Sequence, residues 1–431
     1  MKSSVWLEGS YQQRFADLRR RFGEAAADVR HELFYLGAGR QPWRAGLRAL
    51  VAWLRDTWQL LRQPGHRLQG GERPMILLAT LAGVSGWGTL LRALPALAAQ
   101  PRPVLVLAHP RLPRSGFPAD LPVLRPSRPS PGVLWNSLRT LLRGLAQGQP
   151  LLLASCLARR CLWQGSLQRT LGACQGVLVL HNDFDLMSRA SLGQGLPAIC
   201  LQHGVPTDEF FPVRADWYLV WGASSRRAFV AAGCPDSALI DDSLGRAGLP
   251  VPPPQAPQGL ALLSQTHAPV LGSDIKQRLW ALAAELLRLA PHTRILLHPL
   301  ETEPYHGVAA AACSRPPHPV LRAGGSGTQL VVGYCSTAML EAALAGHWVV
   351  ALQWPLPGNQ AARAVLAAPL HADSAQQVVQ LYGRLRHDAA FREQAADAQA
   401  RWLQASFSEV PGGFAGWLER IAQGSSAEVT P

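Results

Sequence analysis

The sequence predicts an α/β protein with two domains, each built on a parallel sheet, preceded by a helical segment. Short apolar runs alternate with helical patterns from Pro74 onward, which is typical of parallel β-α units. A proline-rich segment, 248–259, interrupts this alternation once and has the composition of a linker. We therefore place the helical extension at 1–70 and the two domains at 71–250 and 251–431.

Length and composition are consistent with a large buried core. The chain has 431 residues, of which 48% are hydrophobic and 16% are charged. The formal net charge is +13, and only Lys2 and Lys276 among the cations are lysines. Arginine binds carboxylate and phosphate through a planar pair of donors, so an anionic partner suits this chain. No basic run or motif of the nucleic-acid type occurs, and we expect no nucleic acid partner.

Cysteine usage and the first residues indicate a cytoplasmic protein. The seven cysteines have no metal-binding spacing, which is typical of buried thiols in a reducing compartment. The start lacks the apolar core of a signal peptide. Met75 to Leu91 is uncharged but is divided by glycines, so a strand, loop and helix explain it better than a membrane span does.

The segment 1–70 has helical spacing throughout its second half. Within 44–63, the apolar residues that recur at helical spacing are Leu47, Leu50, Val51, Leu54, Trp58 and Leu61. The arginines of this helix, Arg44, Arg48, Arg55 and Arg62, occupy other positions. Such a helix can lie on an anionic membrane surface, which would place the protein at the inner face of the cytoplasmic membrane. The alternative is a helix packed against the main body.

In both domains, predicted strands alternate with predicted helices. In the first, we predict strands within 75–83, 102–109, 176–183, 196–204 and 216–222, and helices within 85–100, 134–147 and 223–233. In the second, we predict strands within 259–267, 293–301, 329–337 and 347–355, and helices at 274–290 and 338–346. The remainder, from Asn359 to about Glu419, is predicted as long helical stretches.

Polar clusters fall at the predicted carboxyl ends of these strands. They are 80–88, 181–183, 202–204 with Asp208 and Glu209, 264–267, 298–301 and 334–337. Twin α/β domains bind ligands in the cleft between them, at the carboxyl ends of parallel strands. The clusters are therefore our candidates for an active site.

Two of the clusters in the second domain suit a phosphate group. Ser336 and Thr337 stand where a helix begins, and the N–H groups and dipole of a helix N-terminus attract phosphate. Glu341 lies about one turn further on and can accept hydrogen bonds from ribose hydroxyls. His298 ends a strand before Pro299, and its imidazole can donate to a departing phosphate oxygen. The plain alternative is an ordinary capped helix and a strand-end histidine without a role.

An HP dipeptide at a strand end, followed by a Ser-Thr turn that opens a helix, resembles the bacterial GT-B glycosyltransferases. The similarity is greatest to those that use CMP-activated acidic sugars, the sialyl-, polysialyl- and Kdo-transferases of capsule and lipopolysaccharide synthesis. The "QHG" of 202–204 followed by "DWYLVWG" also resembles capsule-polysaccharide proteins and CDP-glycerol polymerases. The resemblance covers about Pro74 to Glu419 and implies two Rossmann-like domains that face a cleft.

In this family the HP histidine and the Ser/Thr turn contact the nucleotide phosphate, which here implies His298, Ser336 and Thr337. The first strand-to-helix loop of the second domain commonly faces the donor phosphates, which adds Thr266 and His267. No acidic triplet of metal-binding type occurs, so we expect metal-independent transfer without a cofactor.

The first domain of such enzymes binds the acceptor and supplies the base that deprotonates it. Asp208 is our first candidate, His203 the second, and Asp183 also qualifies; the histidine of the CDP-glycerol polymerases favours His203. The alternative for Asp208 and Glu209 is a solvated loop. Gly83 and Gly86 form a loop that can let an acceptor approach the backbone. The acidic motif of sialyltransferases, two acids followed by glycine, has no match here.

The resemblance implies an inverting glycosyltransferase that uses a nucleotide-activated sugar, with CMP-Kdo or CMP-sialic acid favoured, and a glycan or glycolipid acceptor of a bacterial surface polysaccharide. One alternative is a glycerophosphotransferase of the CDP-glycerol type. Another, from a different class, is a non-catalytic relative that serves as a scaffold in the polysaccharide assembly complex.

Overall fold

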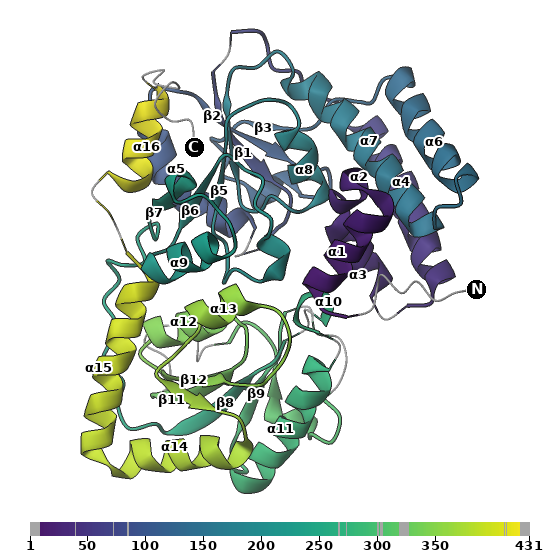
Figure 1. Ribbon diagram of the computed structural model, residues 1–431. Helices are drawn as coiled ribbons and strands as arrows, with labels where there is room; N and C mark the ends of the chain where they lie inside the picture. The colour runs from purple at the N-terminus through teal and green to yellow at the C-terminus, as the bar shows by residue number, and fades with distance from the viewer. Residues whose placement is uncertain are drawn as a thin grey trace.

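The computed structural model describes residues 9–38, 40–71, 73–83, 86–265, 268–272, 274–299, 301, 305–318, 327–408, 410 and 412–422. Two parallel sheets form two lobes, each with helices on its faces (Figure 1). Helices also precede the first sheet. This confirms the predicted fold class: two Rossmann-like domains in the GT-B arrangement, with an N-terminal helical extension.

The first sheet has seven strands in the order β3-β2-β1-β4-β5-β6-β7, and all of its pairs are parallel. The strands are β1 (Met75–Ala79), β2 (Val104–Ala108), β3 (Val123–Leu124), β4 (Val177–Leu180), β5 (Ala198–Leu201), β6 (Trp217–Val220) and β7 (Leu239–Asp241). The strand order reverses between β1 and β4, and such a switch point is where open α/β sheets bind ligands.

Both faces of this sheet are buried, which explains the continuous apolar runs in the sequence. Along β1, Ile76 and Leu78 belong to the core on the side of α7 (Leu151–Leu171). Leu77 and Ala79 belong to the core on the other side, with α5 (Trp87–Ala98). The remaining helices are α6 (Pro131–Ala146), α8 (Leu186–Leu192), η3 (Asp208–Phe210) and α9 (Ala223–Ala231), with short turns η2 (Arg114–Gly116) and η4 (Asp236–Ala238).

The second sheet has six strands in the order β10-β9-β8-β11-β12-β13, again all parallel. Its strands are β8 (Gly259–Leu263), β9 (Arg294–Leu296), β10 (Cys313–Ser314), β11 (Gln329–Gly333), β12 (Trp348–Leu352) and β13 (Leu370–Ala372). Its helices are α10 (Ala268–Leu271), α11 (Ile275–Leu289), η5 (Ala310–Ala312), α12 (Ala338–Leu344), α13 (Gln360–Val365), α14 (Ala375–His387) and α15 (Ala389–Ser406). The predicted long helical stretches from Asn359 to about Glu419 did not include β13, because this edge strand is only three residues long and carries no apolar run.

The N-terminal extension consists of α1 (Tyr11–Phe22), α2 (Glu24–Ala27), α3 (Arg30–Gly37) and α4 (Pro42–Arg62). It packs on the first domain, and α1 also reaches the second. Arg14 donates a hydrogen bond to the carbonyl of Pro269, and Gln12 donates one to the carbonyl of Asp208 (3.4 Å). The extension therefore contacts both domains where they meet.

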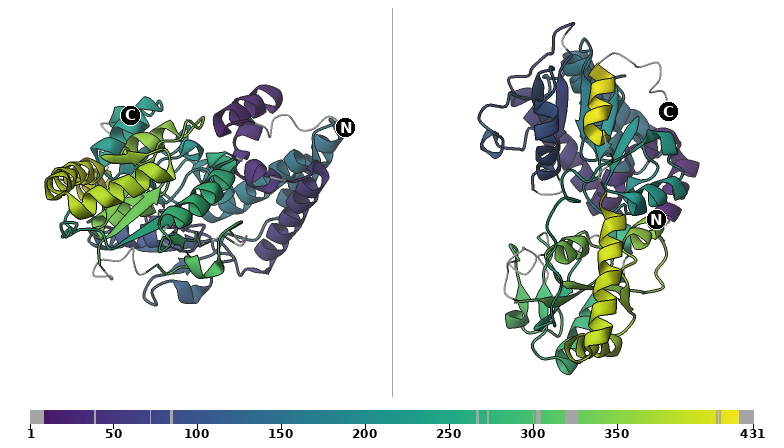
Figure 2. Two further views of the ribbon diagram at one scale, coloured as in Figure 1. Left: turned by 90° about the horizontal axis from the view of Figure 1, so that it is seen from below. Right: turned by 90° about the vertical axis from the view of Figure 1, so that its left-hand side faces the viewer.

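The end of the chain returns to the first domain. After α15 runs along the second lobe, α16 (Gly413–Ala422) packs beside β7 and α5 (Figure 2). Phe414 and Trp417 are buried in the core that also contains Trp217. The sequence boundaries assign α16 to the second domain, whereas the structure places it against the first sheet, because its apolar face is complementary to that sheet.

Candidate functional site

Polar side chains gather at the carboxyl edge of the first sheet. Thr80 follows β1, and its hydroxyl is 2.9 Å from Nε2 of His181, which follows β4. Asn182 donates to Oδ2 of Asp185 (2.8 Å), and Asp185 caps α8 by accepting from Ser188 N–H (2.8 Å). All of these groups lie at the point where the strand order reverses.

His203 is a partly exposed imidazole at this edge. It follows β5, is half-buried, and stacks on Phe210 with ring centroids 4.9 Å apart. The buried ring of His181 lies 6.0 Å from it. Gln202, directly before it, is fully engaged: its amide donates to Gly204 O and Ser225 Oγ (both 3.0 Å) and accepts from Trp221 N–H (2.8 Å). The turn that carries His203 is therefore held firmly, and the ring packs on Phe210 with only part of it exposed.

The two consecutive acids point in different directions. Asp208 faces the second domain: its Oδ1 accepts from the N–H of Asn359 (3.0 Å), and its own N–H donates to Asn359 Oδ1 (3.1 Å). Burial raises the pKa of Asp208. Glu209 faces the N-terminal extension, where its carboxylate accepts from the Tyr35 hydroxyl (3.0 Å) and lies 3.6 Å from Nδ1 of His31. Both acids are buried, so neither is a solvated loop residue.

Asp183 has a structural role in this arrangement. It is buried, and its Oδ2 accepts hydrogen bonds from the Tyr218 hydroxyl and from the N–H groups of Arg214 (2.5 Å) and Ala215 (3.3 Å). These contacts fix the loop before β6. Burial raises the pKa of Asp183, and the Tyr218 contact opposes that shift. Of the three candidate bases, His203 is thus the one whose side chain is half-exposed at the boundary between the domains.

The helical extension adds residues to this edge that sequence reasoning missed. Besides His31 and Tyr35, α3 contributes Glu32, whose Oε1 accepts from the N–H of Leu186 (2.8 Å) at the start of α8. Burial raises the pKa of Glu32. Burial alone would lower the pKa of His31, but the contact with Glu209 and the charge of Glu32 raise it overall. No short motif marks these residues, since only packing of α3 against the sheet brings them here.

In the second domain, His298 and Glu301 lie at the end of β9. His298 is half-buried, and its N–H donates to Oε2 of Glu301 (3.4 Å). The same buried carboxylate accepts from Ser264, which follows β8, and its Oε1 lies 4.0 Å from Lys276 Nζ. Pro299 is exposed. Glu301 therefore joins the ends of two strands and positions the backbone of His298.

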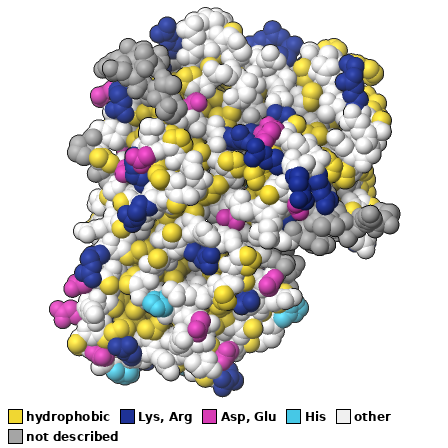
Figure 3. All heavy atoms as spheres, viewed as in Figure 1, with side chains coloured by type: hydrophobic (Ala, Val, Ile, Leu, Met, Phe, Trp, Pro, Cys, Tyr) yellow, Lys and Arg dark blue, Asp and Glu magenta, His cyan; other side chains and the backbone are white. Residues whose placement is uncertain are grey.

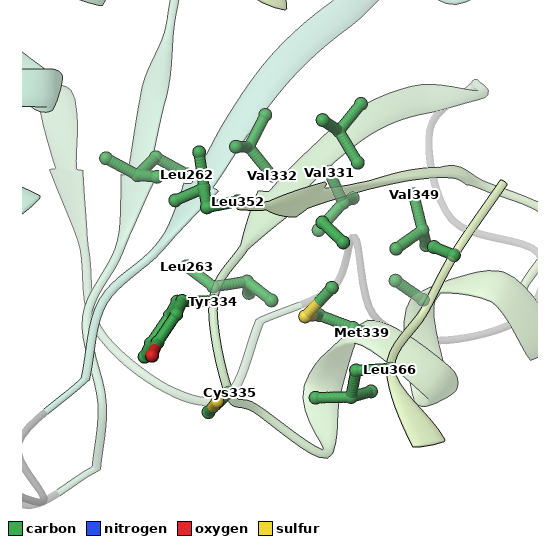
Figure 4. Packing of buried hydrophobic residues seen from close by; sticks show 14 of the residues in the cluster. Leu262, Leu263, Val331, Val332, Tyr334, Cys335, Met339, Val349, Leu352 and Leu366 are labelled. Atoms are coloured by element: carbon green, nitrogen blue, oxygen red, sulfur yellow. The ribbon is translucent and has the colours of Figure 1, made fainter. Parts of the chain in front are cut away.

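The turn after β11 carries the predicted phosphate-site residues Ser336 and Thr337. Tyr334 and Cys335 are buried in the same core as Leu263 and Met339 (Figure 4). Gln265 holds this turn through both the carbonyl and the N–H of Cys335. Ser336 Oγ accepts from Ala338 N–H (3.3 Å), and the Thr337 hydroxyl accepts from Val205 N–H (3.0 Å) of the first domain. Glu341 is exposed on α12.

A pocket of about 390 Å³ opens beside this turn, at the carboxyl ends of β11 and β12. Tyr334 and Trp354 line it, with ring centroids 5.7 Å apart, together with Gln353 and Arg363 of α13. Nε of Arg363 is buried and makes no hydrogen bond with any residue that the structure describes. The pocket thus combines aromatic faces with a guanidinium group, and no sequence motif pointed to Trp354 or Arg363.

Some predicted residues lie elsewhere. Thr266 and His267 are outside the described residues. Gly83 has a φ of +87° and its carbonyl accepts from the N–H groups of Gly86 and Gly88, so the loop folds on itself. A Cβ at Gly86 would lie 2.3 Å from the carbonyl oxygen of Leu81, which explains this glycine by packing within the loop.

Across the described part of the chain, no group of three or more His, Cys, Asp or Glu residues is arranged to hold a metal ion.

The sequence matches no protein-family model and no curated protein. Among solved structures, HepE from Anabaena in complex with UDP and glucose is similar over 82% of this chain and 100% of that chain, with 15% identity and a TM-score of 0.47. A mutant O-GlcNAc transferase from Thermobaculum terrenum covers 99% and 83%, with 15% identity and a TM-score of 0.44. MnaA from S. aureus with UDP covers 81% and 95%, with 11% identity and a TM-score of 0.45. A likeness of this degree establishes no shared activity.

Proposed function

We propose that this protein is an inverting, metal-independent glycosyltransferase that uses a nucleotide-activated sugar, CMP-Kdo or CMP-sialic acid in the first place, to build a bacterial surface polysaccharide. One observation carries the proposal. The turn that holds His203 is bonded to Thr337 across the domain boundary (Val205 N–H to Thr337 Oγ1, 3.0 Å). A candidate base and a candidate phosphate site are thereby brought together at the carboxyl ends of both sheets, where two-domain α/β proteins bind ligands.

On the donor side, the pocket beside Tyr334 suits a nucleotide. Aromatic faces such as Tyr334 and Trp354 stack with a base, and the guanidinium of Arg363 suits phosphate through charge-assisted hydrogen bonds. Ser336 and Thr337 lie at the adjoining turn, and His298 follows β9, which β8 separates from β11 in the sheet. The positive charge of Arg363 would balance the charge on the departing phosphate, which is why we propose transfer without a metal ion.

On the acceptor side, His203 is our proposed base, in preference to Asp208. Its imidazole takes the proton of an acceptor hydroxyl, the hydroxyl oxygen attacks the anomeric carbon, and the bond from that carbon to the nucleotide phosphate breaks. The electron pair of that bond stays on the phosphate oxygen, so the released nucleotide carries the negative charge. Asp208 is occupied by Asn359 and positions α13, which carries Arg363.

A thermal-shift screen against CMP, CDP, UDP, GDP and TDP tests the donor site. A nucleotide at 100 times its dissociation constant stabilises the folded protein by about 2.7 kcal/mol. We expect CMP to raise the melting temperature and the other nucleotides to have less effect. A response to UDP or GDP alone would show that the donor carries that nucleotide instead of CMP. No response to any of the five would contradict the enzyme proposal.

A glycerophosphotransferase of the CDP-glycerol type remains a second candidate, because the "QHG" turn carries the half-exposed histidine that such an enzyme needs. A larger shift with CDP than with CMP would favour it. A scaffold protein of the assembly complex would show no nucleotide response and would keep its complex when His298 is replaced. These outcomes separate the three functions in one set of measurements.

A further inference from the structure

The longest helix of the N-terminal extension exposes its large apolar side chains. Along α4, the residues with 42–56% exposure are Trp43, Leu47, Val51, Leu54, Trp58 and Leu61. Four of the six residues that it buries are small, namely Ala45, Gly46, Ala49 and Ala52, and the other two are Asp56 and Leu60. Apart from Leu60, the large apolar groups face outward or are only partly covered and the buried ones are small, which is the reverse of an ordinary surface helix. The alternative of a helix whose apolar stripe packs on the main body does not hold for these six residues.

The neighbouring helix α6 continues this surface. It also packs on α7, and Ser137 of α6 accepts a hydrogen bond from the indole of Trp53 of α4 (2.8 Å). On α6, Trp135, Leu142 and Leu145 are 42–59% exposed. Figure 3 shows hydrophobic side chains gathered with arginine at the upper right, where α6 lies in Figure 1. We call these nine exposed residues of α4 and α6 the apolar surface; scattered single residues would need no explanation, but a contiguous set does.

The charged side chains that α4 and α6 expose are all arginines. The exposed arginines are Arg44, Arg48, Arg55 and Arg62 on α4, and Arg139 and Arg143 on α6. At roughly 100° of rotation per residue, the α4 row lies beside the apolar stripe, on the side away from Leu50 and Trp53, which pack near α6. The only acid in either helix is Asp56, which is fully buried and bonded to Arg111 and Arg159 (both 2.7 Å). No acid is thus exposed on α4 or α6.

We propose that the apolar surface of α4 and α6 docks on an anionic lipid bilayer, with both helices lying parallel to it. Tryptophan and leucine side chains enter the headgroup region, and the flanking arginines contact lipid phosphates, as amphipathic interfacial helices do. In Arg62 and Arg44 the guanidinium already lies over the exposed indoles of Trp58 (4.4 Å) and Trp43 (5.2 Å), so the cations stay close to the apolar groups.

Charge favours a membrane over a second copy of the chain. A two-fold dimer places the same surface opposite itself. Here six exposed arginines would meet six others without any exposed acid on these helices to pair with them. An anionic bilayer supplies the missing negative charge and the apolar layer together. No described helix is both long and apolar enough to cross a bilayer, so this contact would be peripheral. It depends on neither the nucleotide nor the transfer reaction.

Vesicle flotation of the full chain tests this proposal. Vesicles of phosphatidylcholine are compared with vesicles in which part of the lipid is phosphatidylglycerol. We expect at least about tenfold stronger partitioning to the anionic vesicles, since each arginine near such a surface contributes to binding. The apolar variant L47Q/L54Q/W58Q and the charge variant R48E/R55E should each reduce partitioning about tenfold or more. All five positions are exposed, so the melting temperature should be retained.

Matched controls exclude a general effect of charge or apolarity. R278E/R288E changes the net charge equally on exposed positions of α11, and L91Q/V230Q/L249Q removes exposed apolar groups outside α4 and α6. Both controls should bind vesicles as the unchanged protein does. The proposal is overturned if the unchanged protein ignores anionic vesicles, or if R278E/R288E loses as much binding as R48E/R55E. It is also overturned if light scattering shows a dimer that L47Q/L54Q/W58Q dissociates, because the surface would then belong to a second copy.

Discussion

Asp208 and Asn359 cap each other across the two domains. The N–H of Asn359, at the start of α13, donates to Asp208 Oδ1 (3.0 Å), and the N–H of Asp208 donates to Asn359 Oδ1 (3.1 Å). Asn359 also donates from Nδ2 to the carbonyl of Val270 (2.9 Å), and its φ is +53°, a backbone conformation that asparagine tolerates better than most residues. One reciprocal contact thus sets the position of α13, and with it that of Arg363.

Replacing Asp208 tests this contact. Asp208→Ala should lower the free energy of unfolding by about 1 kcal/mol, the usual cost of a lost helix cap. Asp208→Asn keeps an acceptor and should cost less. Because burial raises the pKa of Asp208 in the folded state, the folded protein holds this proton more tightly than the unfolded chain, and stability falls as pH rises through that pKa. Urea unfolding at several pH values should therefore show that the stability difference between Asp208→Asn and the unchanged protein shifts in favour of Asp208→Asn as pH rises. If Asp208→Asn and Asp208→Ala lose the same unfolding free energy, the cap is contradicted.

Replacing His203 tests the proposed base. His203→Ala should reduce turnover by about 10²- to 10⁴-fold, the range for loss of general base catalysis. Nucleotide-induced thermal shifts should be retained, because His203 belongs to the first domain. His371→Ala, at an exposed histidine of β13, should leave turnover unchanged. If Asp208→Asn abolishes turnover while His203→Ala does not, Asp208 is the base after all.

Replacing Arg363 tests the pocket beside Tyr334. Arg363→Ala should weaken nucleotide binding by about 10- to 100-fold, as expected for a lost hydrogen bond to a charged group. Arg401→Ala removes an exposed arginine of α15 in the same domain and should leave binding unchanged. Titration calorimetry with the nucleotide found by thermal shift measures both. Unaltered binding in Arg363→Ala would place the phosphates elsewhere.

The buried pair of Asp56 and Arg159 supports the helices of the first domain. Both Nε (3.1 Å) and Nη2 (2.7 Å) of Arg159 donate to Asp56 Oδ2, and the Trp163 indole donates to the same oxygen (3.0 Å). Burial would raise the pKa of Asp56, but Arg159 and Trp163 hold it below its usual value. Asp56→Ala should therefore cost about 3–5 kcal/mol of unfolding free energy, since it leaves a buried charge unpaired. Asp120→Ala, at an exposed acid, should change it by less than about 0.5 kcal/mol.

His109 should make the protein less stable in mild acid. Burial lowers the pKa of His109 to about 4, against the partial opposition of Asp56. The unfolded chain then binds a proton between pH 6.5 and 4 that the folded protein does not, so up to about 3 kcal/mol of stability is lost as pH falls through this window. His109→Gln should flatten the dependence of unfolding free energy on pH there, as chemical denaturation at several pH values would reveal. An unchanged slope would show that other groups cause the acid sensitivity.

The sequence predicted those strands best that are buried on both faces. The runs at 75–79 and 177–180 are wholly apolar, and both are central strands. The edge strands β3 and β10 have two residues each and give no such signal. Helix α7 was missed because 13 of its 21 residues are buried around its circumference, so no amphipathic period marks it.

The residues of the candidate site were also predicted only in part. Strand-end position correctly indicated that His203, Asp208 and Thr337 would lie near the domain boundary. The sequence did not reveal the contact of Asp208 with Asn359, which is 151 positions away in the chain. The contribution of α3 was missed for the same reason, since Tyr35 meets Glu209 across 174 positions. Contacts of this separation are created by tertiary packing alone.

The return of α16 to the first sheet has a consequence for synthesis on the ribosome. Phe414, Trp417 and Leu418 cover a face of the sheet that contains Trp217 and Leu219, yet they are translated after the entire second domain. The nascent first domain therefore lacks part of the cover of this apolar face while residues 251–412 emerge, and transiently exposed apolar surface promotes aggregation. A chain shortened before residue 413 would keep that face open permanently and would depend on chaperones.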